Sequence, residues 1–111
     1  MSDVADVKMR LYQRSGGRCE ALLAEQCTGW AEHAHHRKLR SRGGNDTVGN
    51  LADICHRCHE YVHSSRGAVR AKQWGWLVHS YADPTEVPLM RLGRWVLLDD
   101  EGGIAPVEVT S

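Results

Sequence analysis

Residues 33–63 read HAHHRKLRSRGGNDTVGNLADICHRCHEYVH, and the fold that the sequence predicts is decided here. Residues 30–36 suit a short strand, and residues 42–46 form a loop signal rich in Gly, Asn and Asp. Residues 47–54 form a second extended piece, and residues 55–64 have a helical pattern. The expected order of elements is therefore strand, loop, strand and helix.

The segment that precedes this stretch is expected to be a helix followed by irregular chain. Over residues 3–15, Val4, Val7 and Leu11 fall on one helical face, and Ser2 or Asp3 can cap the N-terminus. Gly16-Gly17 should end this helix, and residues 18–31 read as irregular.

The segment that follows is expected to be mixed. In order, we expect a helix over 66–74 with Gly75 at its C-terminal end, an extended piece over Trp76–Val78, a strand over Arg94–Leu98 and a turn over 100–103. The last eight residues carry no packing signal and should be loose. Trp74, Trp76 and Trp95 are expected to anchor the core, with base stacking as the alternative.

Length and composition bound the answer further. The chain has 111 residues, 41% of them hydrophobic and 25% charged, which predicts one α+β domain over 1–111. No run approaches the roughly 20 apolar residues of a membrane span. The N-terminus has no apolar signal-peptide core, so we expect a reducing, cytoplasmic setting without membrane contact. In such a compartment, clustered cysteines bind metal more often than they form disulfides.

Four cysteines are the strongest metal signal. Cys55 and Cys58 form a C-x-x-C pair at a helix start, and Cys19 and Cys27 form a wider C-x7-C arm. Four thiolates from two distant arms suit tetrahedral zinc, which a small domain can use as a cross-link. A disulfide, or buried thiols without a partner, are the alternatives.

Charge is unevenly distributed although the net charge is zero. Residues 35–72 carry 8 basic and 3 acidic side chains, a balance of +5, whereas residues 73–111 carry 2 basic and 6 acidic ones, a balance of −4. The densest basic patch is Arg37, Lys38, Arg40 and Arg42. Such a patch suits phosphate binding, and a solvated loop is the alternative.

Histidines supply a second constellation. His59 and His63 are four residues apart on one helix face, which is a common metal-binding spacing. His35 and His36 are adjacent on a strand, so their side chains should point to opposite faces.

Several short stretches of the sequence, in the order in which they occur, resemble an HNH endonuclease. They are His35-His36-Arg37, Ser41 to Asp46, Asn50-Leu51, Cys55-x-x-Cys58-His59 and His63, and the resemblance covers residues 17–64. The name-giving residues would be His36, Asn50 and His59. The family resemblance implies a zinc-stabilised ββα-metal (His-Me finger) domain with an N-terminal helix, and residues 65–111 would form a C-terminal extension with a short β-rich tail.

The resemblance also implies roles. His36 would be the general base of a one-metal mechanism that hydrolyses DNA phosphodiester bonds, and Asn50 would hold its loop in position. His35, His59 and His63 would bind the catalytic metal, with His33 as an alternative to His35. An all-imidazole set favours Mn²⁺, Ni²⁺, Co²⁺ or Zn²⁺ over Mg²⁺.

The expected partner is duplex DNA, bound with weak sequence specificity. A phage or prophage accessory nuclease in the bacterial cytoplasm is the favoured setting, with packaging proteins such as terminase as candidate partners. The rival functions are a non-catalytic DNA-binding zinc module and a structural zinc protein with surface histidines.

Overall fold

The computed structural model describes residues 4–108. Helix α1 spans Val4–Ser15 and buries Val7 and Leu11, as their spacing predicts. Gly16 and Gly17 end it with φ angles of 64° and 80°, a conformation that glycine adopts without steric cost. The expected caps, Ser2 and Asp3, lie outside the described residues.

A hairpin and a helix follow the irregular residues 18–31. Strand β1, His33–His36, pairs antiparallel with β2, Leu51–Ile54, so that His35 lies opposite Ala52. A 3₁₀ turn at Arg40–Arg42 lies in the connecting loop. Helix α2, His56–Val62, begins directly after β2, and the Sγ atom of Cys55 caps it by accepting the Cys58 N–H. The predicted ββα order is confirmed.

Helix α3, Ser65–Gln73, is capped by the Ser64 hydroxyl and followed by Gly75 at φ 81°, as expected. The extended piece predicted over Trp76–Val78 is wrong. The N–H groups of Trp76 and Leu77 both donate to the Ala71 carbonyl, which winds the chain around the end of α3. This irregular path turns the indole of Trp76 into the core.

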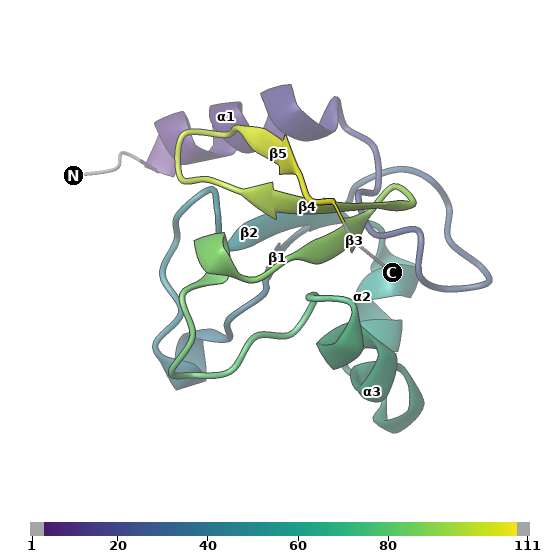
Figure 1. The fold of residues 1–111 in the computed structure, drawn as a ribbon. Coiled ribbons are helices and arrows are strands. Elements are labelled where there is room, and N and C mark those ends of the chain that lie inside the picture. Colours follow the sequence, from purple (N-terminus) through teal and green to yellow (C-terminus); the bar gives the residue numbers. More distant parts are fainter. Residues whose placement is uncertain (1–3, 109–111) are drawn as a thin grey trace.

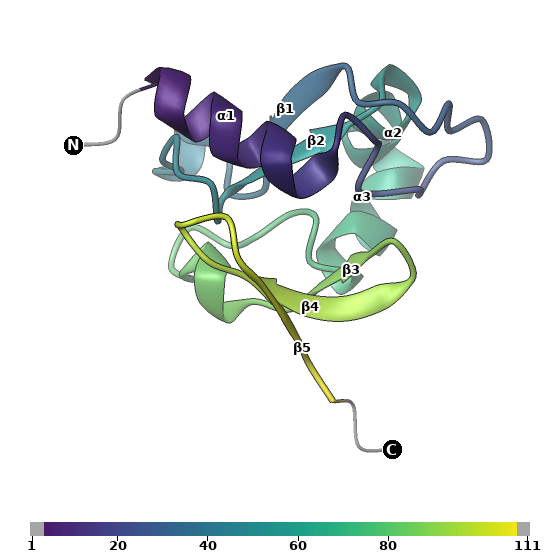
Figure 2. The same cartoon turned by 90° about the horizontal axis from the view of Figure 1, so that it is seen from above.

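The C-terminal part forms a three-stranded antiparallel sheet in the order β3-β4-β5. Its strands are β3 Leu89–Arg91, β4 Arg94–Leu98 and β5 Ile104–Pro106, with a 3₁₀ turn at Pro84–Glu86 before them. The expectation that the last eight residues are loose is therefore wrong for residues 104–106, because β4 offers them a free edge. Residues 109–111 lie outside the described range. Figures 1 and 2 show this sheet beside the α1 and hairpin half of the molecule, with α2 and α3 together at one end.

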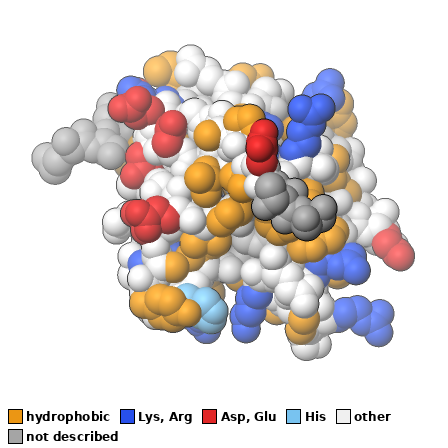
Figure 3. Space-filling model, in the orientation of Figure 1, with side chains coloured by type: hydrophobic (Ala, Val, Ile, Leu, Met, Phe, Trp, Pro, Cys, Tyr) orange, Lys and Arg blue, Asp and Glu red, His pale blue; other side chains and the backbone are white. Residues whose placement is uncertain are grey.

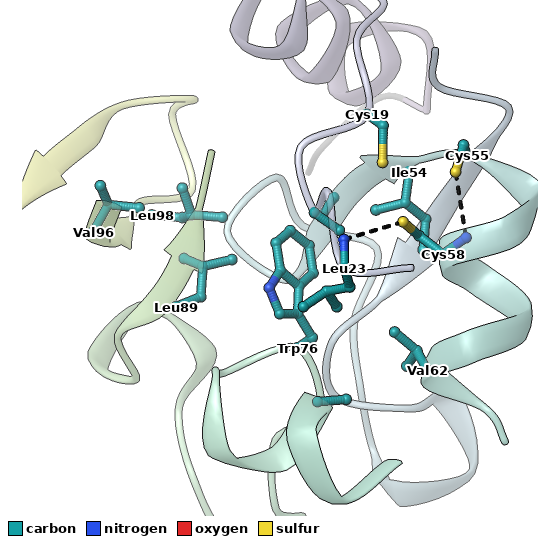
Figure 4. Packing of buried hydrophobic residues seen from close by; sticks show 13 residues of the cluster. Cys19, Leu23, Ile54, Cys55, Cys58, Val62, Trp76, Leu89, Val96 and Leu98 are labelled. Atoms are coloured by element: carbon teal, nitrogen blue, oxygen red, sulfur yellow. Dashed lines mark hydrogen bonds between the residues drawn. The ribbon is translucent and has the colours of Figure 1, made fainter. Parts of the chain in front are cut away.

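One main core joins the motif to the C-terminal sheet. Trp76 is fully buried and packs in a cluster with Ile54, Val62, Leu89 and Leu98 (Figure 4). Truncation of a buried Trp costs about 3–5 kcal/mol, so this residue is a principal anchor. A second cluster of Val7, Leu11, Val48 and Leu51 fixes α1 on β2. Within residues 4–108, the helices are too short and too polar to cross a membrane.

Candidate metal centres

The four cysteines lie together where the irregular segment 18–31 meets α2. Their sulfur atoms lie within 4.8 Å of one another, and all four are free of disulfides. Cys19, Cys55 and Cys58 are fully buried, and Figure 4 shows their side chains beside the main core. The cluster is consistent with structural zinc, as the sequence predicts.

The charge state of the thiols supports this reading. The N–H groups of Leu23 and Ala24 donate to Cys58 Sγ at 3.3 and 3.4 Å, so this sulfur accepts two backbone hydrogen bonds. The contact with Cys58 lowers the pKa of Cys19 to about 5, while the contact with Cys19, together with burial, raises the pKa of Cys58. The thiols therefore cannot all ionise unaided, and a cation bound by four thiolates would remove this conflict.

Three imidazoles form a second cluster between β1 and α2. One ring nitrogen from each of His35, His59 and His63 lies within 4.8 Å of the others. The ring centroids of His59 and His63 are 4.7 Å apart, as their i, i+4 spacing predicts, and both rings lie within 5.7 Å of His35. Exposure rises from buried His35 through half-buried His59 to exposed His63. The cluster is therefore buried on the side of His35 and open to solvent on the side of His63.

The ring of His35 is held in one orientation. Its Nε2 atom lies 2.8 Å from the Trp76 carbonyl oxygen, an acceptor, so Nε2 carries the proton and donates it. That leaves Nδ1 as the lone-pair nitrogen. Burial lowers the pKa of His35 to about 4, which keeps the imidazole neutral as metal binding requires. The role of the Trp76 carbonyl could not be found from sequence, because it depends on a backbone path 41 residues away.

The adjacent His36 lies on the other side of β1, as strand alternation predicts. Its Nε2 atom lies 2.6 Å from Asp46 Oδ1, and Arg40 donates two further hydrogen bonds to the same carboxylate. These contacts with His36 and Arg40 hold the pKa of the Asp46 carboxyl below its usual value. The sequence analysis missed Asp46, although its place in a Gly-Asn-Asp loop between the strands was a usable signal.

Asn50 is buried and braces the loop that links the two strands. Its side-chain oxygen accepts the Lys38 N–H at 2.7 Å, and its amide nitrogen donates to the carbonyls of Lys38 and Asn45 at 3.0 Å each. These bonds tie the chain just after His36 to the start of β2. The contacts fit the loop-holding task expected of Asn50.

The structure corrects one predicted phosphate contact. Arg37 is fully buried, so it cannot reach DNA. Its guanidinium donates to four backbone carbonyls, those of Gly49, Gly75, Pro84 and Val87. Arg37 therefore joins the hairpin to the C-terminal part, a structural role that charge alone could not distinguish from a solvent-facing one.

The other basic loop residues remain at the surface. Arg40 and Arg42 are exposed, and Lys38 is half-buried with its Nζ donating to the Ala82 carbonyl. On the face in Figure 3, acidic side chains gather mainly at the left, while most Lys and Arg lie along the right and lower edges.

A buried ion network fixes α1 against the rest of the fold. Arg14 forms a two-pronged ion pair with Glu20 at 2.9 Å, and Arg91 from β3 approaches the same carboxylate at 2.6 Å. Burial would raise the pKa of Glu20, but hydrogen bonds and charge from Arg14, with a contribution from Arg91, outweigh it and lower the pKa.

The fold and its two clusters define a class: a ββα domain that carries a four-Cys cluster and a three-imidazole site between strand and helix. Residues 18–65 match the family model described as HNH endonuclease, so this part of the chain is similar to the domain of that family. The match covers somewhat less than half of the 111 residues and agrees closely with the range expected from the motifs. Comparisons with curated proteins and with solved structures gave no significant match.

Proposed function

We propose that this protein is a metal-dependent endonuclease that hydrolyses DNA phosphodiester bonds. The observation that carries the proposal is the convergence of His35, His59 and His63, with His36 directly after His35 at the end of β1. Three ring nitrogens from two elements form an open-fronted donor set, which suits a catalytic rather than a closed structural metal. A divalent ion held there would supply charge relief at the scissile phosphate.

His36 takes the part of general base. The Asp46 carboxylate accepts the Nε2 proton of His36, which leaves Nδ1 as the nitrogen able to accept a proton from water. Asn50 keeps the loop after His36 in place through its bonds to Lys38. In this proposal His36 accepts the proton of water, Asp46 orients the His36 ring, and Asn50 holds the loop that follows His36.

Lys38, Arg40 and Arg42 hold the flanking phosphates. They follow β1 directly, so they lie on the loop that carries the proposed base. Contacts of this kind are made to the backbone of DNA, which predicts weak sequence preference. A phage or prophage accessory nuclease is the setting we propose from the family resemblance, and a neighbouring terminase gene would support it.

Two variants test the proposal. His36→Ala should keep both metal sites and lose cleavage by about 10²–10⁴-fold, the usual contribution of a general base. His59→Ala should lose both cleavage and the metal of the imidazole site. Calorimetric metal titration beside a plasmid-nicking assay reads out both. A parent protein that binds DNA but never nicks it, with every divalent metal tried, would instead indicate a non-catalytic zinc module.

A further inference from the structure

A third group of donor side chains lies beside the imidazole site and is separate from it. Glu32 precedes β1, His33 opens β1, and His56 is the first residue of α2. One donor atom from each of the three lies within 4.8 Å of the others. The His33 ring also stacks on His59 with centroids 4.8 Å apart, which places this group next to the imidazole site.

The spacing of the two imidazoles suits a shared cation. His33 Nε2 lies 3.1 Å from His56 Nδ1. Two ring nitrogens that each lie about 2.1 Å from one metal, at the angles of tetrahedral or octahedral coordination, are about 3.0–3.4 Å apart. The observed separation, at which the two rings also share a hydrogen bond, falls within that interval.

The surroundings of His56 match those of a metal-bound histidine. Its Nε2 atom lies 3.4 Å from Glu60 Oε1, so a carboxylate orients the ring from the far side while Nδ1 faces His33. Metal-binding histidines commonly carry such a carboxylate partner. Glu32 accepts the His56 backbone N–H through Oε2 at 3.1 Å, which aligns its carboxylate at the same point.

We propose that Glu32, His33 and His56 form an accessory site for a borderline divalent metal such as Ni²⁺ or Zn²⁺, oriented by Glu60. Imidazole with carboxylate is a donor set that such metals prefer. A cation there clamps the edge of β1 to the first turn of α2, the helix that carries His59 and His63. The inference does not depend on nuclease activity.

Metal stoichiometry tests the site directly. Protein with zinc in its cysteine cluster, equilibrated with Ni²⁺ and analysed by equilibrium dialysis, should bind two Ni²⁺ per chain. His56→Ala should bind one Ni²⁺ under the same conditions. Its affinity for the second Ni²⁺ should fall at least about tenfold, because a direct ligand is gone. Ni²⁺ should also raise the Tm of the parent in two steps and that of the variant in one.

Two further variants complete the experiment. Glu32→Gln keeps the acceptor for the His56 N–H and removes the negative charge, so it should also weaken the second equivalent. His79→Ala, which removes an exposed imidazole stacked on Tyr81, is the matched control and should still bind two Ni²⁺. One Ni²⁺ in the parent, or two in His56→Ala, would overturn the proposal. Two Ni²⁺ in a parent that does not cut DNA would leave it standing while the nuclease proposal falls.

Discussion

His36 Nε2 and Asp46 Oδ1 lie 2.6 Å apart, a contact that joins the last residue of β1 to the loop ten residues further on. Both side chains are partly exposed, so the pair contributes little to stability and its value must lie in how it orients the imidazole.

Asp46→Ala should therefore slow cleavage without unfolding the protein. Loss of a partner that orients a functional imidazole typically costs about 10–100-fold. Nicking rates measured at one pH should fall by this factor, because the tautomer of His36 is no longer fixed. Asp6→Ala, which removes a partly exposed carboxylate of α1 that pairs with Arg10, is the matched control and should cut at the rate of the parent. A loss in Asp46→Ala no larger than that in Asp6→Ala would contradict the orienting role of Asp46.

Substitution of Arg37 should lower stability, whereas substitution of Lys38 and Arg40 should lower DNA affinity. Arg37→Ala removes the side-chain donor of four backbone carbonyls, and the contacts to Gly49 and Gly75 are buried. Each buried carbonyl that finds no substitute costs about 1–3 kcal/mol, so the Tm should fall sharply. Lys38→Ala with Arg40→Ala should keep the Tm and flatten the logarithmic salt dependence of DNA binding by about one per lost phosphate contact. An unchanged salt slope would place the DNA face elsewhere.

Cys58→Ser should remove the zinc cross-link. Structural zinc contributes on the order of 10 kcal/mol in small zinc domains, and here the cysteines are part of the main core. The variant should lose zinc and its near-ultraviolet circular dichroism. Retained zinc with an unchanged spectrum would defeat the zinc assignment.

The Glu20 ion pair should make stability depend on pH. The pKa of Glu20 is lowered on folding, so its contribution is present above the unfolded value of 4.5 and is lost as pH falls through the folded value. Glu20→Gln should cost about 3–5 kcal/mol at pH 7. That difference from the parent should shrink toward pH 3 in urea unfolding, because Glu20 of the parent becomes protonated and loses its ion pair. Acid affects the cysteine cluster of both proteins alike, so the difference reports on Glu20 alone.

Asp53 works in the opposite direction. Burial raises its pKa on folding, so it disfavours folding as pH rises, and Ser15 partly relieves this through a 2.6 Å hydrogen bond. A constant difference between parent and Glu20→Gln across the whole pH range would contradict the assigned role of Glu20.

Metal replacement should reveal the donor set. After chelation and dialysis, Mn²⁺ or Ni²⁺ should restore cleavage better than Mg²⁺ at equal low concentration, because Mg²⁺ prefers oxygen ligands. Asp53 pairs with Ala34 and therefore faces away from His35, while Glu60 is engaged by His56. Within the described chain, neither carboxylate joins the imidazole cluster. Full activity with micromolar Mg²⁺ would show that this donor set is incomplete.

The parts of the site that could be predicted are those encoded by local spacing. The i, i+4 pair His59 and His63, the alternation of His35 and His36, and the C-x-x-C pair all follow from the geometry of a single helix or strand. The burial of Arg37 could not be predicted, because its partners Gly75, Pro84 and Val87 lie 38, 47 and 50 residues further along the chain. The contact between Arg91 and Glu20 is equally non-local, because the two residues are 71 positions apart in the sequence.

The backbone carbonyls that accept hydrogen bonds from His35 and Arg37 determine how far this domain can be truncated. A fragment ending at residue 65 would keep the cysteines and the histidines of both clusters, yet it would lose the oxygen of Trp76 and three of the four carbonyls around Arg37. Such an excised motif would carry a buried cation with too few acceptors and a histidine free to rotate. The smallest transplantable unit therefore extends at least to Val87, well past residue 65, where the family match ends.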